Sequence, residues 1–208
     1  GNMITAGAGA MMSKVAAVAA RASLSGFEPL SGIPGTLGGA VYMNAGAYGG
    51  EMKNVVKTVT YIDDNGDLHT VGNAECGFGY RHSVFSDGGK YIVSAVLELQ
   101  VGDERTIRAE MDEYSRRRSE KQPLSQPSAG STFKRPEGYF AGKLIQDAGL
   151  MGYRIGGAAV SEKHAGFVVN TGGATAEDVL SLIEYIIDTV EKKFGVRLEP
   201  EVRLVGER

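Results

Sequence analysis

Apolar residues recur at two different spacings along the chain, and each spacing predicts one kind of element. A spacing of three and four positions, typical of a helix with one buried face, covers residues 11–25, 103–121 and 176–194. Alternation of apolar and polar residues, typical of a strand, covers residues 55–62 and 91–101. The chain is therefore predicted to be α+β, built from two small units of sheet and helix, and it contains no internal repeat.

The three predicted helices have defined ends and buried faces. Thr175 with Asp178 is typical of a capping box, and Gly195 is expected to end the third helix. Pro123 and Pro127 stop the second helix and place a predicted domain boundary between residues 122 and 123. The side chains expected to face inward are Met12, Val15, Val18, Ala19 and Ala22, then Ile107, Met111 and Tyr114, and finally Val179, Ile183, Ile186, Val190 and Phe194.

Shorter strands are expected near the ends of the chain and beside a turn. Residues 3–9 are expected to form a strand and a turn, and residues 63–67 form a hairpin turn that leads into a strand at 68–71. Two further short strands are expected at residues 166–170 and 201–205.

Composition and charge narrow the class of protein. The 208 residues suffice for a sizeable core, and the net charge of -3 gives no electrostatic footprint for nucleic acid. No apolar run has membrane-spanning length, and no signal peptide is visible. The single cysteine, Cys76, suits a reducing cytoplasm, and its spacing from His82 and His164 predicts no metal site.

The segment from Gly32 to Gly50 differs from the rest of the chain, because seven of its nineteen residues are glycine. Glycine permits positive φ angles and close approach to a ligand. Glycines in a turn before a short helix can present free N–H groups to a phosphate. On spacing alone, a phosphate cradle and a tight turn between packed elements are equally good interpretations.

The order of residues in this segment is more specific. Residues 31–40 read Ser-Gly-Ile-Pro-Gly-Thr-Leu-Gly-Gly-Ala, and residues 43–49 read Met-Asn-Ala-Gly-Ala-Tyr-Gly. This resembles the flavin-binding segment of the UDP-N-acetylenolpyruvoylglucosamine reductases, bacterial enzymes of peptidoglycan precursor synthesis. Three further blocks match the family in order: Gly-Tyr-Arg-His-Ser-Val-Phe at 79–85, Pro-Ser-Ala-Gly-Ser-Thr-Phe-Lys at 127–134 and Leu-Glu-Pro-Glu-Val-Arg at 198–203.

The resemblance implies a fold and a division into domains. Residues 1–122 are expected to be the latter part of a two-subdomain flavin-binding fold of the vanillyl-alcohol-oxidase type. Residues 123–208 are expected to be a small α+β substrate-binding domain. In the family an additional N-terminal region precedes residue 3 and supplies a second loop around the flavin diphosphate, so the sequence is expected to be a fragment. The short interval between Arg81 and Lys121 resembles the branch of the family without an extra tyrosine-bearing loop.

The resemblance also implies a reaction, cofactors and a partner. Such an enzyme uses NADPH to reduce FAD and passes the hydride to C3 of the enolpyruvyl group of UDP-N-acetylglucosamine enolpyruvate, which yields UDP-N-acetylmuramate. Negative charge then develops at C2 and on the substrate carboxylate, and C2 must receive a proton. The residues implied in FAD binding are Gly32, Ile33, Pro34, Gly35, Thr36, Gly38, Gly39, Ala40 and Asn44.

Three residues are the catalytic candidates by resemblance. Arg81 is implied to grip the substrate carboxylate, Ser131 to donate the proton to C2, and Glu201 to assist that protonation. From local sequence alone, Arg81 also reads as a surface arginine and Ser131 as a loop serine that caps a turn. Glu199 competes with Glu201. The full set implied in substrate binding is Tyr80, Arg81, Lys121, Ser131 and Arg135.

One further expectation and two alternative functions remain. The arginines at 116–118 are expected to form a solvated helix face. Another flavoenzyme of the same fold, such as a carbohydrate or aromatic-alcohol oxidase, is an alternative function. A non-catalytic nucleotide-binding or interaction module is the other alternative. The oligomeric state is not predicted.

Overall fold

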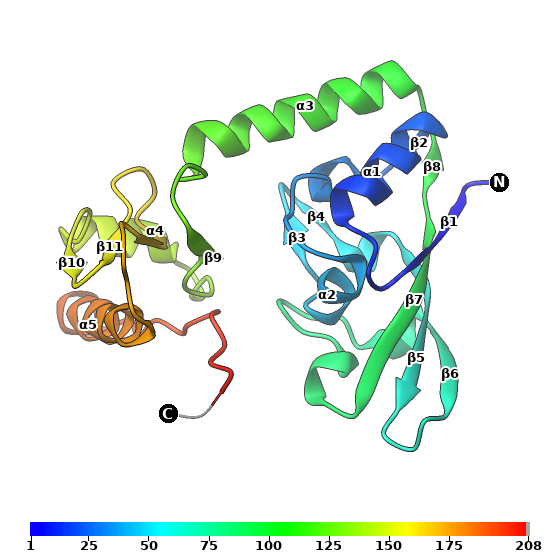
Figure 1. Cartoon of the computed structure of the whole chain (residues 1–208). Helices are drawn as coiled ribbons and strands as arrows, with labels where there is room; N and C mark the ends of the chain where they lie inside the picture. Colours follow the sequence, from blue (N-terminus) through cyan, green and yellow to red (C-terminus); the bar gives the residue numbers. More distant parts are fainter. Residues whose placement is uncertain (207–208) are drawn as a thin grey trace. The chain divides into compact units, whose positions relative to one another are not determined.

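A computed structural model describes residues 1–206, and the chain divides into two compact units. The first unit is Gly1–Arg118 and the second begins at Ser119. Each unit has its own sheet and its own core, which confirms the predicted α+β class (Figure 1).

The first unit is built on a four-stranded antiparallel sheet. Its strand order is β1 (Met3–Gly7), β7 (Lys90–Glu98), β5 (Val56–Asp63) and β6 (Leu68–Gly72). Figure 1 shows α1 (Met12–Arg21) and α2 (Leu37–Tyr42) beside this sheet, and their buried side chains share its core. The remaining short elements are β2 (Leu24–Ser25), η1 (Glu28–Leu30), β3 (Gly46–Ala47), β4 (Gly50–Glu51), η2 (Met52–Asn54), η3 (Asn73–Cys76), η4 (Val84–Asp87) and β8 (Gln100–Val101).

Two boundaries in the first unit differ from the prediction. The first helix ends at Arg21 instead of residue 25, because Ser23 takes a positive φ of 54° and the chain turns into β2. The single strand expected at 91–101 is two strands, since β8 leaves β7 to pair with β2. Val18 and Ala22 are exposed, and Ala16 and Ala20 are buried instead. Alanine and valine recur on several sides of this helix, so the spacing of its apolar residues did not identify the buried face.

The helix α3 (Glu104–Lys121) confirms the helix predicted at 103–121. Ile107 is buried and Met111 packs against the first core. Tyr114 stacks on Tyr48 with 4.8 Å between ring centroids. The predicted inward face is therefore present, and it reaches the glycine-rich segment through Tyr48.

The second unit places two helices on one face of a four-stranded antiparallel sheet. The strand order is β10 (Arg154–Ile155), β11 (Ala158–Val160), β12 (Phe167–Asn170) and β9 (Ser128–Ser131). Figure 1 shows the helices α4 (Ala141–Asp147) and α5 (Ala176–Phe194) of this unit. Their side chains Ile145 and Ile186 are buried in one core with Val160 and Val168. Ala159, Phe167 and Val169 form a separate small cluster.

The ends of α5 confirm the predicted caps. Thr175 Oγ1 accepts a hydrogen bond from the Asp178 amide at 3.1 Å, and Asp178 accepts one from the Thr175 amide at 3.0 Å. The backbone N–H groups of Thr175 and Gly157 hold the pKa of Asp178 below its ordinary value. Gly195 ends the helix with a φ of 68°.

One strand that was predicted in the second unit is wrong. Residues 201–205 form no strand, because regular pairing stops near the bridge between Phe133 and Pro200. Beside this bridge the Lys134 amide bonds the Glu199 carbonyl and the Glu201 amide bonds the Thr132 carbonyl. Leu204 and Val205 are exposed as a result. Phe194, expected in the buried stripe, is 39% exposed at the last turn of α5.

Gly38 gives a test of packing in the first unit. A Cβ at Gly38 would lie 2.8 Å from the Ala8 Cβ, whereas a Cβ at Gly39 would meet Thr36 Oγ1 at an ordinary 3.5 Å. We expect Gly38→Ala to lower the free energy of unfolding by about 1–3 kcal/mol through overpacking. Gly39→Ala, one position along the same helix, should be neutral or stabilise by up to about 1 kcal/mol. Urea unfolding of both variants measures the difference, and equal values for the two would contradict this packing account.

Candidate active site

The glycine-rich segment uses its amides internally where the short helix begins. The amides of Leu37 and Gly38 donate to the carbonyls of Ala10 and Ala8, each at 2.8 Å, and the Ala40 amide donates to Thr36 at 2.9 Å. Thr36 Oγ1 accepts from the Gly39 amide at 3.3 Å as the cap of α2. The expected free N–H groups are therefore not at the start of α2. The segment instead exposes backbone that carries little side chain, at Gly32, Pro34, Gly35 and Gly39.

Asn44 ties this segment to two neighbouring loops. Its side chain is buried, with 1% exposed, and its backbone has a φ of 42°. Its Nδ2 donates to Glu51 Oε2 and to the Gly79 carbonyl, each at 2.8 Å. Its Oδ1 accepts from the Lys53 amide at 2.9 Å. The amide group is thus occupied within the protein, and the implied contact of Asn44 with the cofactor stays a prediction.

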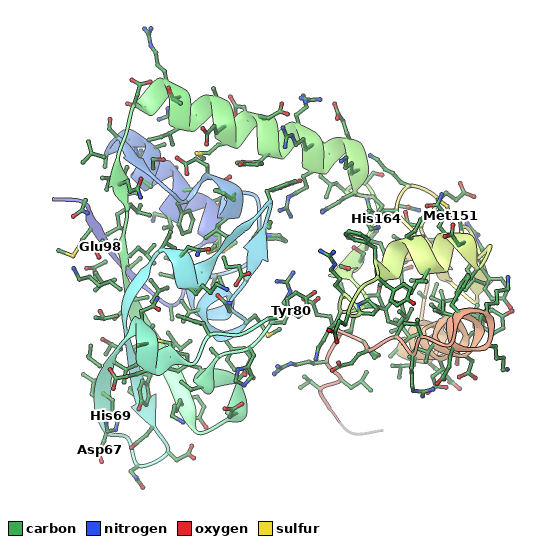
Figure 2. All side chains as sticks on the ribbon, turned by 180° about the vertical axis from the view of Figure 1, so that it is seen from behind. Asp67, His69, Tyr80, Glu98, Met151 and His164 are labelled. Atoms are coloured by element: carbon green, nitrogen blue, oxygen red, sulfur yellow. The ribbon has the colours of Figure 1, made fainter. Side chains whose placement is uncertain are left out.

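Tyr80 and Arg81 form the tip of a tight turn fixed by these bonds. The Gly79 amide donates to the His82 carbonyl at 3.0 Å, and the His82 amide donates back at 3.3 Å. Ser83, fully buried, donates its hydroxyl to the Tyr42 carbonyl at 2.7 Å. Arg81 has a φ of 52°, a strained backbone for a side chain of this kind. Tyr80 is 55% exposed at the tip (Figure 2).

The charge of Arg81 acts on the carboxylate of Glu51. The Lys53 side chain, which bonds Glu51 at 3.0 Å, holds the pKa of Glu51 below its ordinary value, and the charge of Arg81 lowers that pKa further. The guanidinium of Arg81 also lies 5.2 Å from the Tyr80 ring centroid. The tip therefore presents a cation and an aromatic ring on a rigid backbone turn.

In the second unit, Thr132 fixes the position of Ser131. The Thr132 amide donates to the Gly166 carbonyl at 2.8 Å, and its buried Oγ1 accepts from the Val168 amide at 3.0 Å. Ser131 is exposed beside it, with its Oγ 3.5 Å from the Phe133 carbonyl. The Glu201 amide donates to the Thr132 carbonyl at 2.8 Å. The structure therefore brings the backbones of Ser131 and Glu201 together.

The carboxylate of Glu199, the alternative to Glu201, is paired with a lysine. The Glu199 side chain forms an ion pair with Lys134, and the Lys134 amide donates to the Glu199 carbonyl at 2.9 Å. The Glu199 side chain is 69% exposed, whereas Glu201 is half-buried. Of the two carboxylate residues, Glu201 is the one whose backbone amide bonds next to Ser131, at the Thr132 carbonyl.

The remaining predicted substrate residues lie on the surface of the described chain. Lys121 is exposed at the last position of α3. Arg135 Nε donates to the Tyr139 carbonyl at 3.3 Å, and its guanidinium lies 4.0 Å from the Phe140 ring centroid. Their roles in binding stay predictions.

Arg118 is the residue that sequence reasoning missed. It was expected on a solvated face with Arg116 and Arg117, and those two do pair with Glu113. The Arg118 Nε, in contrast, is buried without a hydrogen-bond partner among residues 1–206. The available signal was its place four residues after Tyr114, on the inward-facing side of α3.

The second unit has two further polar features, a histidine and a cavity. His164 is half-buried beside Phe167, burial lowers its pKa, and its Nδ1 accepts from the Gly166 amide at 3.1 Å (Figure 2). A cavity of about 280 Å³ opens between the Pro123–Gln126 segment and β11 and β12. Its charged lining comes from Arg154, Glu162 and Lys163.

Further features of the described residues concern metals, thiols and membranes. Across residues 1–206, no three His, Cys, Asp or Glu side chains gather in a way that fits a metal ion. Burial raises the pKa of the Cys76 thiol to about 11, so the thiol is unreactive at neutral pH. Within that same range, the helices lack the combined length and apolar character needed to cross a bilayer.

Comparisons with known proteins cover both units. Residues 1–72 match a family model described as an FAD binding domain, and residues 122–205 match the model of the UDP-N-acetylenolpyruvoylglucosamine reductase C-terminal domain. The UDP-N-acetylenolpyruvoylglucosamine reductase of Caldanaerobacter subterraneus is 56% identical over all 208 residues, and the one from Lachnoclostridium phytofermentans is 55% identical. The chain covers 69% and 67% of these two proteins.

A solved structure agrees with these relatives. The crystal structure of the UDP-N-acetylenolpyruvylglucosamine reductase from Thermus caldophilus matches 96% of this chain and is itself covered to 71%, with a TM-score of 0.86 and 40% identity. Sequence identity along the whole chain, two family models in order and a shared fold lead to one conclusion. The chain belongs to the UDP-N-acetylenolpyruvoylglucosamine reductase family.

Proposed function

We propose that this chain supplies flavin-binding and substrate-binding parts of an NADPH-dependent reductase. The enzyme reduces the enolpyruvyl group of UDP-N-acetylglucosamine enolpyruvate to give UDP-N-acetylmuramate, a peptidoglycan precursor. The observation that carries this proposal is the 56% identity over all 208 residues to a reductase of this name. We assign residues 1–122 to flavin binding and residues 123–208 to substrate binding, and we place the reaction in the cytoplasm, where NADPH and nucleotide sugars are available.

The first unit fits FAD at the glycine-rich segment. Exposed backbone at Gly32, Gly35 and Gly39 permits close approach of a planar ring or a diphosphate, and Gly35 has a φ of 128° that favours glycine. The residues proposed to line the cofactor are Gly32, Ile33, Pro34, Gly35, Thr36, Gly38, Gly39, Ala40 and Asn44. When bound, FAD supplies the hydride that NADPH has delivered to it.

Arg81 is proposed to orient the substrate carboxylate. Its planar guanidinium makes two parallel hydrogen bonds to a carboxylate, and it opposes the negative charge that develops when the double bond accepts a hydride. The turn fixed by Asn44 and Ser83 holds the backbone of Arg81 before substrate arrives. A fixed cation reorganises little during the reaction, which is the basis of electrostatic stabilisation.

Ser131 is proposed to give its hydroxyl proton to C2 of the substrate. A serine hydroxyl is a poor acid, so the proton must be replaced as it leaves, and a nearby carboxyl group is suited to that task. The Glu201 amide donates to the Thr132 carbonyl, so Glu201 lies on the segment that runs beside Ser131. Together with Tyr80, Lys121 and Arg135, these residues form the proposed substrate set.

Removal of the Ser131 hydroxyl separates the two halves of the reaction. In the holoenzyme, we expect Ser131→Ala to leave flavin reduction by NADPH unchanged and to slow reduction of the enolpyruvyl substrate by roughly 10²–10⁴-fold. Ser128→Ala, on the same strand and also exposed, is the matched control and should alter neither rate. Anaerobic stopped-flow absorbance of the flavin measures both rates. An equal loss in both half-reactions contradicts the role of proton donor.

The two carboxylates of the 198–203 block can be tested against each other. We expect Glu201→Gln to slow the substrate half-reaction, because the amide cannot replace the proton lost by Ser131. Glu199→Gln removes a carboxylate that pairs with Lys134 at the surface, so its effect on that rate should be small. The measurement is the same stopped-flow rate with each variant. A larger effect from Glu199→Gln reverses the assignment.

Arg81→Lys tests the geometry of carboxylate binding while the charge is kept. Lysine cannot form the paired hydrogen bonds of a guanidinium, so we expect the substrate half-reaction to slow by roughly 10²–10³-fold. Arg117→Lys, on the exposed side of α3, provides the control. Rates close to those of the unmodified holoenzyme in Arg81→Lys would show that this side chain does not hold the carboxylate.

A further inference from the structure

Arg118 occupies a position on α3 where an inward-facing residue is expected. It follows Ile107, Met111 and Tyr114 at helical spacing, and these three face the first core or the glycine-rich segment. The guanidinium carbon of Arg118 lies 5.9 Å from the centre of the Tyr48 ring. The helix therefore places a permanent cation against the segment that is proposed to bind FAD.

One hydrogen-bond donor of this cation, the Arg118 Nε, has no acceptor within the described residues. Its neighbours Arg116 and Arg117 both bond Glu113, at 2.8 Å and 2.6 Å. The Arg118 Nε is also buried. A buried donor without an acceptor raises the free energy of the folded state, so such a group in a folded protein needs an explanation.

Two residues of the glycine-rich segment, Gly32 and Tyr48, lie against the guanidinium. A Cβ at Gly32 would lie 3.1 Å from the Arg118 Nε, so the absence of a side chain there is what admits the arginine. Tyr48 stacks on Tyr114 at 4.8 Å and keeps a φ of 51°, a strained backbone for a tyrosine. Strain of this kind persists where the surroundings enforce it, and it is concentrated at ligand sites.

We propose that Arg118 is a flavin-binding residue, and this inference rests on the proposed function. Its guanidinium, positioned by Gly32 and Tyr48, donates to an anionic or carbonyl acceptor of the bound flavin nucleotide. Two parts of that nucleotide offer such acceptors: the diphosphate and the N1 and C2-carbonyl edge of the isoalloxazine ring. Binding satisfies the buried Nε donor, which explains why no group of the protein does so.

The test is a set of binding measurements with FAD and with riboflavin, which has no phosphate. We expect Arg118→Met to weaken FAD binding by roughly ten- to hundredfold, because it removes a charged hydrogen-bond donor and keeps most of the side-chain volume. Arg118→Lys keeps the charge but has no Nε, so its affinity for FAD should lie between those of Arg118→Met and the unmodified protein. Weaker binding of FAD alone assigns the contact to the diphosphate. Weaker binding of riboflavin as well, with a lower flavin reduction potential, assigns it to the ring edge.

Stability measurements separate this role from a structural one. Removal of an unpaired buried donor should leave the thermal stability of the flavin-free Arg118→Met protein unchanged or raise it. Arg117→Met, one position along and paired with Glu113, is the matched control and should bind FAD normally.

Three outcomes overturn this inference, and a fourth overturns the proposal on which it rests. FAD binding in Arg118→Met equal to that of the unmodified protein overturns this inference, and so does a loss of affinity for the UDP-sugar alone. A loss of stability in the flavin-free variant that accounts for its weaker FAD binding overturns it as well. Failure of the unmodified protein to bind FAD overturns instead the flavin-binding proposal on which it rests.

Discussion

The buried amide of Asn44 is the interaction on which the geometry of the first unit depends. Three hydrogen bonds from one side chain join the glycine-rich segment to the Gly79 carbonyl, the Lys53 amide and the Glu51 carboxylate. Apolar burial holds Leu37, Ala40 and Val41 of this segment in the first core, but its glycines have no side chains to pack. A satisfied buried polar group fixes the part that packing does not, because loss of any one bond leaves a buried donor or acceptor unpaired. The positions of Tyr80 and Arg81 follow from this arrangement.

The second unit applies the same principle with a different residue. Thr132 is buried with its hydroxyl bonded to the Val168 amide, and its carbonyl accepts from Glu201. Ser131 therefore lies exposed next to an immobile neighbour, and Glu201 approaches it without belonging to a regular strand. In both units, a buried polar residue next to the candidate catalytic residue fixes the backbone. The candidate side chains, Arg81 and Ser131, project from these fixed backbones.

The sequence predicted the elements that a single period or a cap defines. The helices α3 and α5, with the Thr175 cap and Gly195, follow from spacing and end signals, and so does the turn between β5 and β6. Prediction failed where partners distant in sequence decide the outcome. Val202 and Leu204 alternate as in a strand, but among residues 1–206 they pair with no neighbouring strand beyond the Phe133–Pro200 bridge. The four family blocks located the candidate residues, whereas the bonds of Asn44 and Thr132 required coordinates.

Arg118 shows why local composition was a poor guide to that position. Three consecutive arginines indicate a solvated face, yet a helix turns by about 100° per residue, so three neighbours cannot share one environment. Two of them meet Glu113 and the third meets Gly32 and Tyr48. The unpaired Nε and the strained backbone of Tyr48 both raise the free energy of the flavin-free protein. Such unfavourable features are tolerated where a bound ligand relieves them. Any hydrogen-bond acceptor that reaches Nε relieves the cost of the unpaired donor.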